Sequence, residues 1–352
     1  MAAQSLIGAN SAIVLMLEEI QLRFNHARLI VAALLLLLPF SAAADKILIM
    51  VGGIDKQIYL PAQLAEQLGL FKEQGLNVEL QSESSGVNAE NAMLAGVAQG
   101  VVGFYDHTID LQAKGKAVLS VVQLSQAPGE ALLISTRFAQ LIKSPADFKG
   151  RVLGVTGMGS STYFLTQYLS VTANVKASEF STVPVGSGAS FIAALREGRI
   201  DAGMTTEPTI SRLLATGDAK VLVDLRTPES TEKWLGGLYA AACLYMPAVW
   251  VNGHREEVQK LVNAFVKTLK FINTHTAEEI ASKMPVDYYA GNKAMYVRAL
   301  AQSKTMFTAD GRMPTSGPPT VLKVLKGFDK AVQGKTIDLS KTFTTEFVEA
   351  AR

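Results

Sequence analysis

Two short loops of glycine and serine are the residues of this chain best suited to holding a small molecule. They span residues 157–162 and 186–190, and each lies between a short apolar run and a helical pattern. A helix that starts at such a loop offers unpaired backbone N–H groups to a negative or polar ligand group. Because glycine and serine are also common in ordinary turns, the loops alone leave both interpretations open.

An acidic residue follows the last of three short strands predicted within residues 149–208. Glu207 stands at the tip of this strand, where the ligands of open α/β sheets bind. Its carboxylate would accept a hydrogen bond from an amine or hydroxyl group of a ligand. The alternative is an ion pair or a helix cap behind the site.

Polar residues end an earlier strand in the same way. Tyr105, Asp106 and His107 follow an apolar run, and Asp106 is as well suited to capping the next helix as to contacting a ligand. Tyr59 and Tyr239 would supply an aromatic wall, although tyrosine is also an ordinary half-buried packing residue.

Side chains for catalysis are sparse. His107, His254 and His275 are far apart in sequence and show no metal-ligand spacing. Neither a Gly-x-Ser-x-Gly elbow nor a phosphate-binding Gly-Lys-Ser/Thr loop is present. Cys243 lies in an apolar run, where a role as a small core residue is favoured over a role as nucleophile. We therefore predict a protein that is not an enzyme, without catalytic residues, metal or cofactor.

The elements that must position these residues alternate between strands and helices. Apolar runs at 46–51, 76–80, 101–104, 152–156 and 182–185 predict strands, with helical patterns between them. A long amphipathic helix is predicted over residues 258–272. This alternation predicts an α/β fold with largely parallel sheets flanked by helices.

A weak internal echo predicts two similar lobes. Residues 92–96 and 194–198 both run from alanine through an apolar residue to glycine, at an offset of 102 positions. The same offset places Tyr105 opposite Glu207.

The chain begins with a segment typical of a secretory signal peptide. Arg23 and Arg28 precede an uninterrupted apolar run, residues 29–40, which ends in small residues. This run is shorter than the about 20 residues that span a bilayer; an N-terminal anchor helix is the alternative. We predict that residues 1–44 are removed after Ala44 and that the mature protein is periplasmic.

The charge balance argues against nucleic acid as a partner. The chain has 33 basic and 31 acidic residues, a net charge of +2 that removal of the signal peptide leaves unchanged. A single cysteine means that packing, rather than an internal disulfide, must hold the fold.

Four stretches together resemble the periplasmic solute-binding proteins of ABC importers, in particular the nitrate/sulfonate/taurine and thiamine-pyrimidine-precursor binding family. The stretches are LPAQLAEQLGLFKEQGLNVEL, ESSGVNAENAMLAGVAQGVVGF, SPADFKGRVLGVTGMGSS and FIAALREGRIDAGMTTEP, which span most of residues 46–210. The resemblance implies the type II periplasmic-binding-protein fold, in which two α/β lobes joined by two crossing strands close on a small ligand.

The resemblance also places the ligand site in loops between the lobes. With the two tyrosines, the predicted ligand-binding residues are Gly53, Ile54, Tyr59, Ser84, Ser85, Gly86, Tyr105, Asp106, His107, Gly159, Ser160, Ser161, Thr162, Ser187, Glu207 and Tyr239. These loops hold no arginine, the usual bidentate partner of an oxyanion, which disfavours a strongly anionic ligand. Gln99 departs from the family, which usually has an aspartate there; Asp201 keeps it in the second lobe.

The lobe boundaries and partners follow from the same resemblance. We expect residues 45–136 and 239–352 to form the first lobe and residues 137–238 the second, with hinges near 135–138 and 237–240. A monomer would capture a small polar or aromatic organic compound and deliver it to ABC permease and ATPase subunits in the inner membrane. Sulfonate, aromatic acid and nitrogen heterocycle all stay open as the ligand.

Two other classes of function fit the same two-lobe scaffold. One is an enzyme similar to a pyrimidine-precursor synthase or a small-acid decarboxylase, although the cysteine-rich motif of the pyrimidine-synthesising members is absent here. The other is a sensory protein that presents its ligand to a receptor. A secretory signal without a catalytic set favours the transport protein.

Overall fold

The computed structural model describes residues 16, 21–23, 46–289 and 291–351. Residues 45–352 belong to one compact unit. The predicted signal peptide, residues 1–44, lies almost wholly outside the described residues, so its cleavage site stays a prediction. Among the described residues, no helix combines the length and the apolar character needed to span a membrane.

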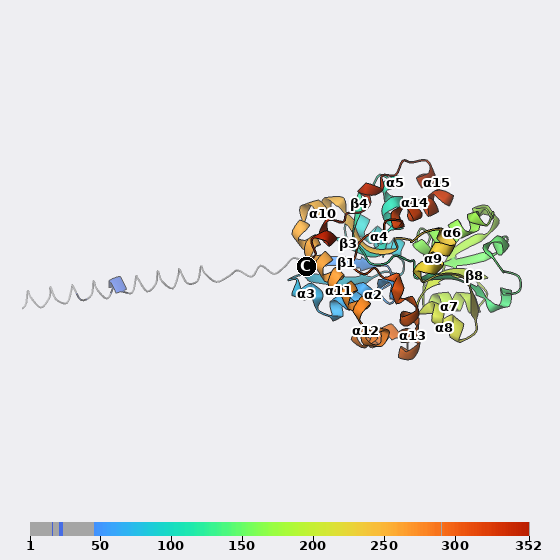
Figure 1. Cartoon of the computed structure of the whole chain (residues 1–352), viewed down its shortest axis with the longest axis horizontal. Coiled ribbons are helices and arrows are strands. Elements are labelled where there is room, and N and C mark those ends of the chain that lie inside the picture. Colours follow the sequence, from blue (N-terminus) through green and yellow to red (C-terminus); the bar gives the residue numbers. More distant parts are fainter. Residues whose placement is uncertain (1–15, 17–20, 24–45, 290, 352) are drawn as a thin grey trace, which may run out of the picture. The chain divides into compact units, whose positions relative to one another are not determined.

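The first lobe is built on a five-stranded sheet with the strand order β2–β1–β3–β10–β4 (Figure 1). Its strands are β1 (Lys46–Val51), β2 (Asn77–Ser82), β3 (Gly100–Phe104), β4 (Val118–Gln123) and β10 (Ala242–Pro247). β1, β2 and β3 are parallel, whereas β10 runs antiparallel to both β3 and β4. Every residue of β3 is buried, as expected for a central strand that is covered on both faces.

The second lobe repeats this arrangement in the strand order β7–β6–β8–β5–β9. Its strands are β5 (Glu130–Ser135), β6 (Val152–Val155), β7 (Ser181–Pro184), β8 (Ala202–Thr206) and β9 (Ala219–Leu225). β6, β7 and β8 are parallel, and β5 runs antiparallel to β8 and β9. The prediction of a two-lobe α/β fold with mostly parallel sheets is confirmed.

The internal echo in the sequence reflects this repeated topology. β3 and β8 are equivalent central strands, and their bounds differ by the offset of 102 found in the sequence. Directly before them, the Gln99 side chain accepts a hydrogen bond from Leu48 N at 2.7 Å, and that of Asp201 accepts one from Val152 N at 2.9 Å. Gln99 therefore keeps the contact of the usual aspartate.

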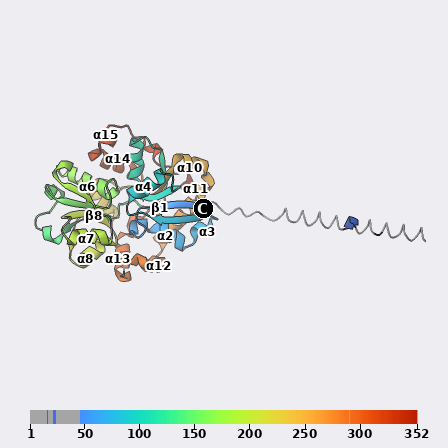
Figure 2. The ribbon, with the colours of Figure 1, turned by 180° about the vertical axis from the view of Figure 1, so that it is seen from behind.

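Helices cover both sheets, and Figures 1 and 2 show those of the second lobe gathered around β8. They are α6 (Ser161–Thr172), α7 (Ala189–Arg196), α8 (Thr209–Ala215) and α9 (Pro228–Leu235). The other α-helices are α2 (Leu60–Gln67), α3 (Leu70–Glu73), α4 (Gly86–Leu94), α5 (Asp106–Ala113), α10 (Ala248–Gly253), α11 (Arg255–Thr274), α12 (Ala277–Lys283), α13 (Lys293–Ser303), α14 (Gly317–Phe328), α15 (Lys330–Gln333) and α16 (Glu346–Glu349). Short 3-10 helices cover Gln57–Tyr59, Thr136–Phe138, Pro145–Phe148, Ala177–Glu179, Val286–Tyr289, Lys304–Met306 and Leu339–Lys341.

The long helix α11 anchors the first lobe. Its apolar residues recur at helical spacing, and most of those from Val258 to Ile272 are buried, as the sequence predicts. Phe265 meets Phe71 of α3 edge to face, with ring centroids 5.6 Å apart. This packing fixes α3, and α2 beside it, against the body of the lobe.

Two connections, residues 124–129 and 236–241, link the lobes and lie side by side. Tyr239 N donates to Gln126 O at 3.0 Å, and Ser125 N donates to Ala242 O at 3.0 Å. The second connection covers residues 237–240, where a hinge is expected. The first corrects the expected boundary at residue 136, because β5 pairs with β8 and β9 and therefore belongs to the second lobe.

The helix α14 lies in the C-terminal region assigned to the first lobe, yet it packs against both lobes. Phe328 at its end has its ring centroid 5.8 Å from that of Phe164 in α6. Lys323 Nζ donates to Leu235 O at the end of α9, at 2.8 Å. These contacts, together with those of α14 to α5, make this helix a bridge between the lobes.

Candidate functional site

The lobes meet where the loops after β2 and β6 approach each other. Gly157 lies very close to the first lobe: a Cβ atom at this position would be only 2.9 Å from Ser85 Oγ. Glycine, which has no Cβ, avoids this steric clash. Nearby, the ring centroids of His107 and Phe164, from opposite lobes, are 6.3 Å apart. The backbone of Gln57 adds a direct link, donating from N to Glu207 O at 3.1 Å. We call this region the lobe junction.

Asp106 enters the lobe junction from the first lobe as the first residue of α5. Its carboxyl group is fully buried, and Tyr239 Oη donates to Oδ2 at 2.9 Å. Oδ1 has no hydrogen-bond partner among the described residues and lies 3.8 Å from His107 Nε2. Burial raises the pKa of Asp106 to about 7, against the lowering effect of the tyrosine hydrogen bond.

Glu130 enters from the second lobe as the first residue of β5. It is 1% exposed, and Ser161 Oγ donates to Oε1 at 2.6 Å, whereas Oε2 is without a partner among the described residues. Burial raises the pKa of Glu130 to about 8 despite the hydrogen bond from Ser161, and the negative charge of Asp106 adds to this rise. The two carboxyl groups are thus close enough to interact.

His107 stands beside Asp106 as an uncharged ring. Its Nδ1 is 3.0 Å from Tyr245 Oη and 3.3 Å from Glu90 Oε2. Burial lowers the pKa of His107 to about 3, so the imidazole is neutral at physiological pH. Burial likewise raises the pKa of Glu90 to about 8. His107 Nε2 and Ser160 Oγ, both buried, have no partner within the described chain.

Lys56 is the cationic side chain of this region, and it is almost fully buried. Its Nζ donates to Gly52 O at 2.5 Å. Burial lowers the pKa of Lys56 to about 8, although the charges of Asp55 and Glu130 oppose the shift. The amine is therefore held by the backbone of its own loop rather than by an ion pair.

Comparison with known families and structures identifies the fold. The family described as NMT1/THI5 like matches residues 59–279. A solved structure from Bordetella bronchiseptica RB50 is 37% identical, with a TM-score of 0.83, and the match covers 87% of this chain and 96% of that one. The chain belongs to the NMT1/THI5-like family.

More distant structures share the fold. The alkanesulfonate-binding protein SsuA of Xanthomonas axonopodis pv. citri, bound to MOPS, is 16% identical with a TM-score of 0.69, covering 86% of this chain and 99% of its own. The periplasmic nitrate-binding protein NrtA of Synechocystis PCC 6803 is 12% identical with a TM-score of 0.68, covering 88% of both chains. No curated protein matches the chain. These findings confirm the family that the sequence resembles.

Most of the predicted ligand-binding residues of this NMT1/THI5-like chain do gather at the lobe junction. Gly53, Ser84 and Ser187 line a groove of about 290 Å³ that residues of both lobes enclose. Ser85 caps α4, accepting from Asn88 N at 3.3 Å. Gly86 and Tyr59 lie nearby. A Cβ atom on Gly86 would be 3.0 Å from His107 Cε1, and a Cβ atom on Gly52 would be 3.1 Å from the Tyr59 hydroxyl, so both residues are closely packed. Gly159 meets the first lobe at Val87.

Two predicted residues serve to orient others. Ser161 holds Glu130, and Tyr239 holds Asp106, so each hydroxyl fixes one oxygen of a carboxyl group. The sequence predicts an aromatic wall at Tyr239, but its hydroxyl is the part with a defined role.

Four predicted residues are engaged elsewhere. Tyr105 points into the first lobe, where its hydroxyl bonds to Thr342. Thr162 Oγ1 accepts from Thr156 N at 3.0 Å, inside its own loop. Ile54 is half-buried, and its N donates to Ser82 Oγ at 3.0 Å. Their side chains supply packing or loop structure rather than a group that faces a ligand.

Glu207 is the fourth, and both oxygens of its carboxylate already accept hydrogen bonds within the second lobe. Oε1 accepts from Arg226 Nη1 at 2.9 Å, and Oε2 accepts from Ser211 N at 2.9 Å. The alternative considered for this residue, an ion pair behind the site, is what the structure shows. Glu207 reaches the lobe junction only through its backbone carbonyl.

Glu130 and Lys56 were not predicted from the sequence. Glu130 directly precedes an apolar run, residues 131–135. If this run formed a strand parallel to its neighbours, its first residue would lie at the edge of the sheet opposite to the candidate site. Because β5 runs antiparallel to β8, Glu130 pairs with Thr206 and lies at the edge where the parallel strands end. The sequence feature that could have pointed to Glu130 is an acidic residue directly before a strand that is apolar throughout.

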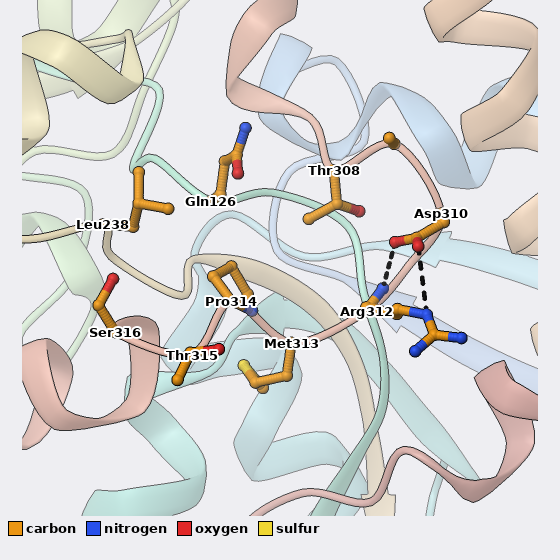
Figure 3. A pocket seen from close by; sticks show the side chains of 10 residues that line it. Gln126, Leu238, Thr308, Asp310, Arg312, Met313, Pro314, Thr315 and Ser316 are labelled. Atoms are coloured by element: carbon orange, nitrogen blue, oxygen red, sulfur yellow. Dashed lines mark hydrogen bonds and ion pairs between the residues drawn. The ribbon is translucent and has the colours of Figure 1, made fainter.

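A second, larger pocket adjoins the connections rather than the predicted residues (Figure 3). It has a volume of about 650 Å³ and is lined by Gln126 and Leu238, one from each connection, together with the segment from Thr308 to Ser316. Asp310 and Arg312 pair with each other on its wall, which leaves no isolated charge there.

Proposed function

We propose that this protein is an extracytoplasmic solute-binding protein that captures a small polar or aromatic organic compound between its lobes. The observation that carries the proposal is a set of buried polar atoms at the lobe junction that have no partner within the described part of the chain and come from both lobes. Asp106 and His107 come from one lobe, and Glu130 and Ser160 from the other. Buried polar atoms of folded proteins are nearly always hydrogen-bonded, so such a set is suited to a ligand.

The paired connections supply the hinge. They are short, and backbone hydrogen bonds tie them to each other while each continues into the sheet of a different lobe. Rotation about them would separate the two halves of the site and admit the solute. The loaded protein would then dock on an ABC permease with its ATPase subunits in the inner membrane, as a monomer in the periplasm.

Binding without chemistry fits the side chains present. Cys243 is fully buried, and burial raises the pKa of its thiol, so it is no nucleophile at physiological pH. We therefore propose that the solute leaves the site unchanged. An enzyme of the same fold would instead convert it.

The test uses protein exported with its own leader and purified from the periplasm without denaturation. Native mass spectrometry should show a small molecule bound one to one. Denaturation should release this molecule, and incubation of fresh protein with it should return it unaltered with a raised melting temperature. Recovery of a converted product would favour the enzyme. The absence of any bound or stabilising compound would contradict the proposal.

A further inference from the structure

Two carboxyl groups from opposite lobes face the lobe junction, and each offers one free oxygen. Asp106 and Glu130 are each held by a hydroxyl donor at one oxygen, so their orientations are fixed before a ligand arrives. The remaining oxygens, Asp106 Oδ1 and Glu130 Oε2, have no donor among the described residues. A buried carboxyl oxygen without a donor is costly, so this pair is suited to a ligand that brings N–H groups.

The side chains around the pair do not neutralise it. Lys56 donates to a backbone carbonyl and forms no ion pair with either acid, although its charge lies close enough to Glu130 to lower the pKa of that acid. His107 is uncharged. Arg226, which lies in the second lobe, is bound by Asp224 and Glu207. Two polar atoms nearby, Ser160 Oγ and His107 Nε2, have no partner among the described residues and carry no charge. The charge that an incoming cation meets near the pair is that of Lys56, which burial already disfavours by lowering its pKa to about 8.

The groove between the lobes carries the same sign of charge. Asp55 and Glu83 line it together with glycine and serine residues from both lobes, and no basic residue belongs to its wall. Carboxylates at the entrance of a cleft raise the local concentration of cations and speed their association. The same field repels anions such as sulfonate or nitrate.

We propose that the ligand is a small organic cation with N–H groups, an ammonium or amidinium compound, bound between Asp106 and Glu130. The inference rests on the proposed function and names the charge class of its solute. The N–H groups donate to Asp106 Oδ1 and Glu130 Oε2, so the cation links the two lobes. Its charge favours the ionised form of both acids and displaces the protons that burial favours in the ligand-free protein. Each of these hydrogen bonds is charge-assisted and lies where water is excluded.

The experiment compares matched compounds on the natively purified protein. The compounds form sets, and the members of one set share a single carbon skeleton. The skeletons range from two carbons to a phenyl ring. Within each set, one member has an amidinium or primary ammonium group, one has a neutral amide and one has a sulfonate. Thermal-shift screening followed by calorimetric titration should find binders among the cations. The matching amides should bind at least tenfold more weakly, and the sulfonates should not bind.

Variants that keep shape but remove charge complete the test. Glu130→Gln and Asp106→Asn should weaken the best cation by about tenfold to a hundredfold, the range expected for a charged hydrogen bond. Glu197→Gln, in the exposed pair with Arg199, is the matched control and should leave binding unchanged. Ser161→Ala keeps every charge and should give a smaller loss, which separates misorientation of Glu130 from loss of its charge.

The outcomes separate the two proposals. The proposal of a cationic ligand would be overturned if sulfonates or amides bound as tightly as the cations and the Glu130 and Asp106 variants kept these affinities. The proposed function as a solute-binding protein would still stand in that case. No stabilisation by any class, together with no co-purified compound, would overturn solute binding itself.

Discussion

Replacing Glu207 by glutamine separates a structural from a ligand-binding carboxylate. The residue ends a strand at the edge where ligands of α/β sheets bind, but its two oxygens already accept from Arg226 and from Ser211 N. Glutamine keeps the shape and one acceptor. Its amide group must then face either the guanidinium or the backbone N–H, which places a donor against a donor.

The size of the effect follows from the burial of this pair. Glu207 is 2% exposed and Arg226 is 15% exposed, so little solvent replaces the lost interaction. Arg226 retains Asp224, which accepts at 2.7 and 2.9 Å, so the cost stays below that of stranding a lone buried charge. We expect a loss of roughly 1.5–3 kcal/mol in the free energy of unfolding. For a chain of this size, that corresponds to a fall in melting temperature of about 2–5 °C.

Differential scanning calorimetry of the ligand-free protein measures this fall, and calorimetric titration measures the affinity for the best binder. Glu197→Gln removes a carboxylate from an exposed pair with Arg199 and should shift the melting temperature by less than about 1 °C. Glu207→Gln should lower stability with affinity nearly unchanged. An unchanged melting temperature with lost binding would refute the assignment of Glu207 to the scaffold.

Three further predictions concern the lobe junction. Ser161→Ala should weaken binding by roughly 0.5–1.5 kcal/mol in titration calorimetry, because Glu130 loses the donor that orients it. Gly157→Ala should weaken binding and lower the compactness of the loaded protein in small-angle scattering, because its Cβ would lie 2.9 Å from Ser85 Oγ of the first lobe; full affinity in this alanine variant would contradict the prediction. The ligand-free protein should lose stability between about pH 6.5 and 8 in denaturant titrations, because the raised pKa values of Glu90, Asp106 and Glu130 keep protons on the folded state that the unfolded state has released. The lowered pKa of the buried histidine opposes this fall mainly below about pH 6.5, and the lowered pKa of Lys56 opposes it mainly above about pH 8. A stability that rises with pH within the window would count against the buried carboxyl groups.

Alternation of apolar runs with helical patterns was enough to predict the fold class, and the offset of 102 was enough to predict two similar lobes. The lobe boundary near residue 136 was misplaced for a specific reason. An apolar run such as 131–135 does not reveal its direction or its partners, and only the pairing of β5 with β8 and β9 assigns it to the second sheet. Local sequence specifies a strand, whereas long-range pairing specifies its sheet.

The loops of the candidate site could be anticipated from the sequence, whereas the environment of its charged groups could not. Glycine and serine mark the loops because turns and helix starts require them, so Ser85, Gly86 and Ser161 were assigned to loops that the structure places at the lobe junction. Whether a carboxylate faces a ligand or an arginine depends on residues far away in the chain. Glu207 is bound by Arg226 and Glu130 is not, a difference that no local pattern around either acid records.

The repeat itself shows why symmetry between the lobes, which set Tyr105 opposite Glu207, does not lead from Asp106 to Glu130. β3 and β8 are equivalent strands, so the position equivalent to Asp106 in the second lobe is Pro208. The strand β5 corresponds to β10, and Glu130, which pairs with the last residue of β8, corresponds to Ala242, which pairs with the last residue of β3. Each lobe therefore contributes its carboxyl group from a position that is uncharged in the other lobe. A duplicated scaffold would bring equal groups face to face, whereas these two acids approach from a helix start and from an antiparallel strand. They can thus lie on different sides of one ligand, each with a separate hydroxyl to orient it. A cation that bridges them draws the lobes together with one contact from each, and loss of either carboxyl group should leave the other half of the site intact but unable to close.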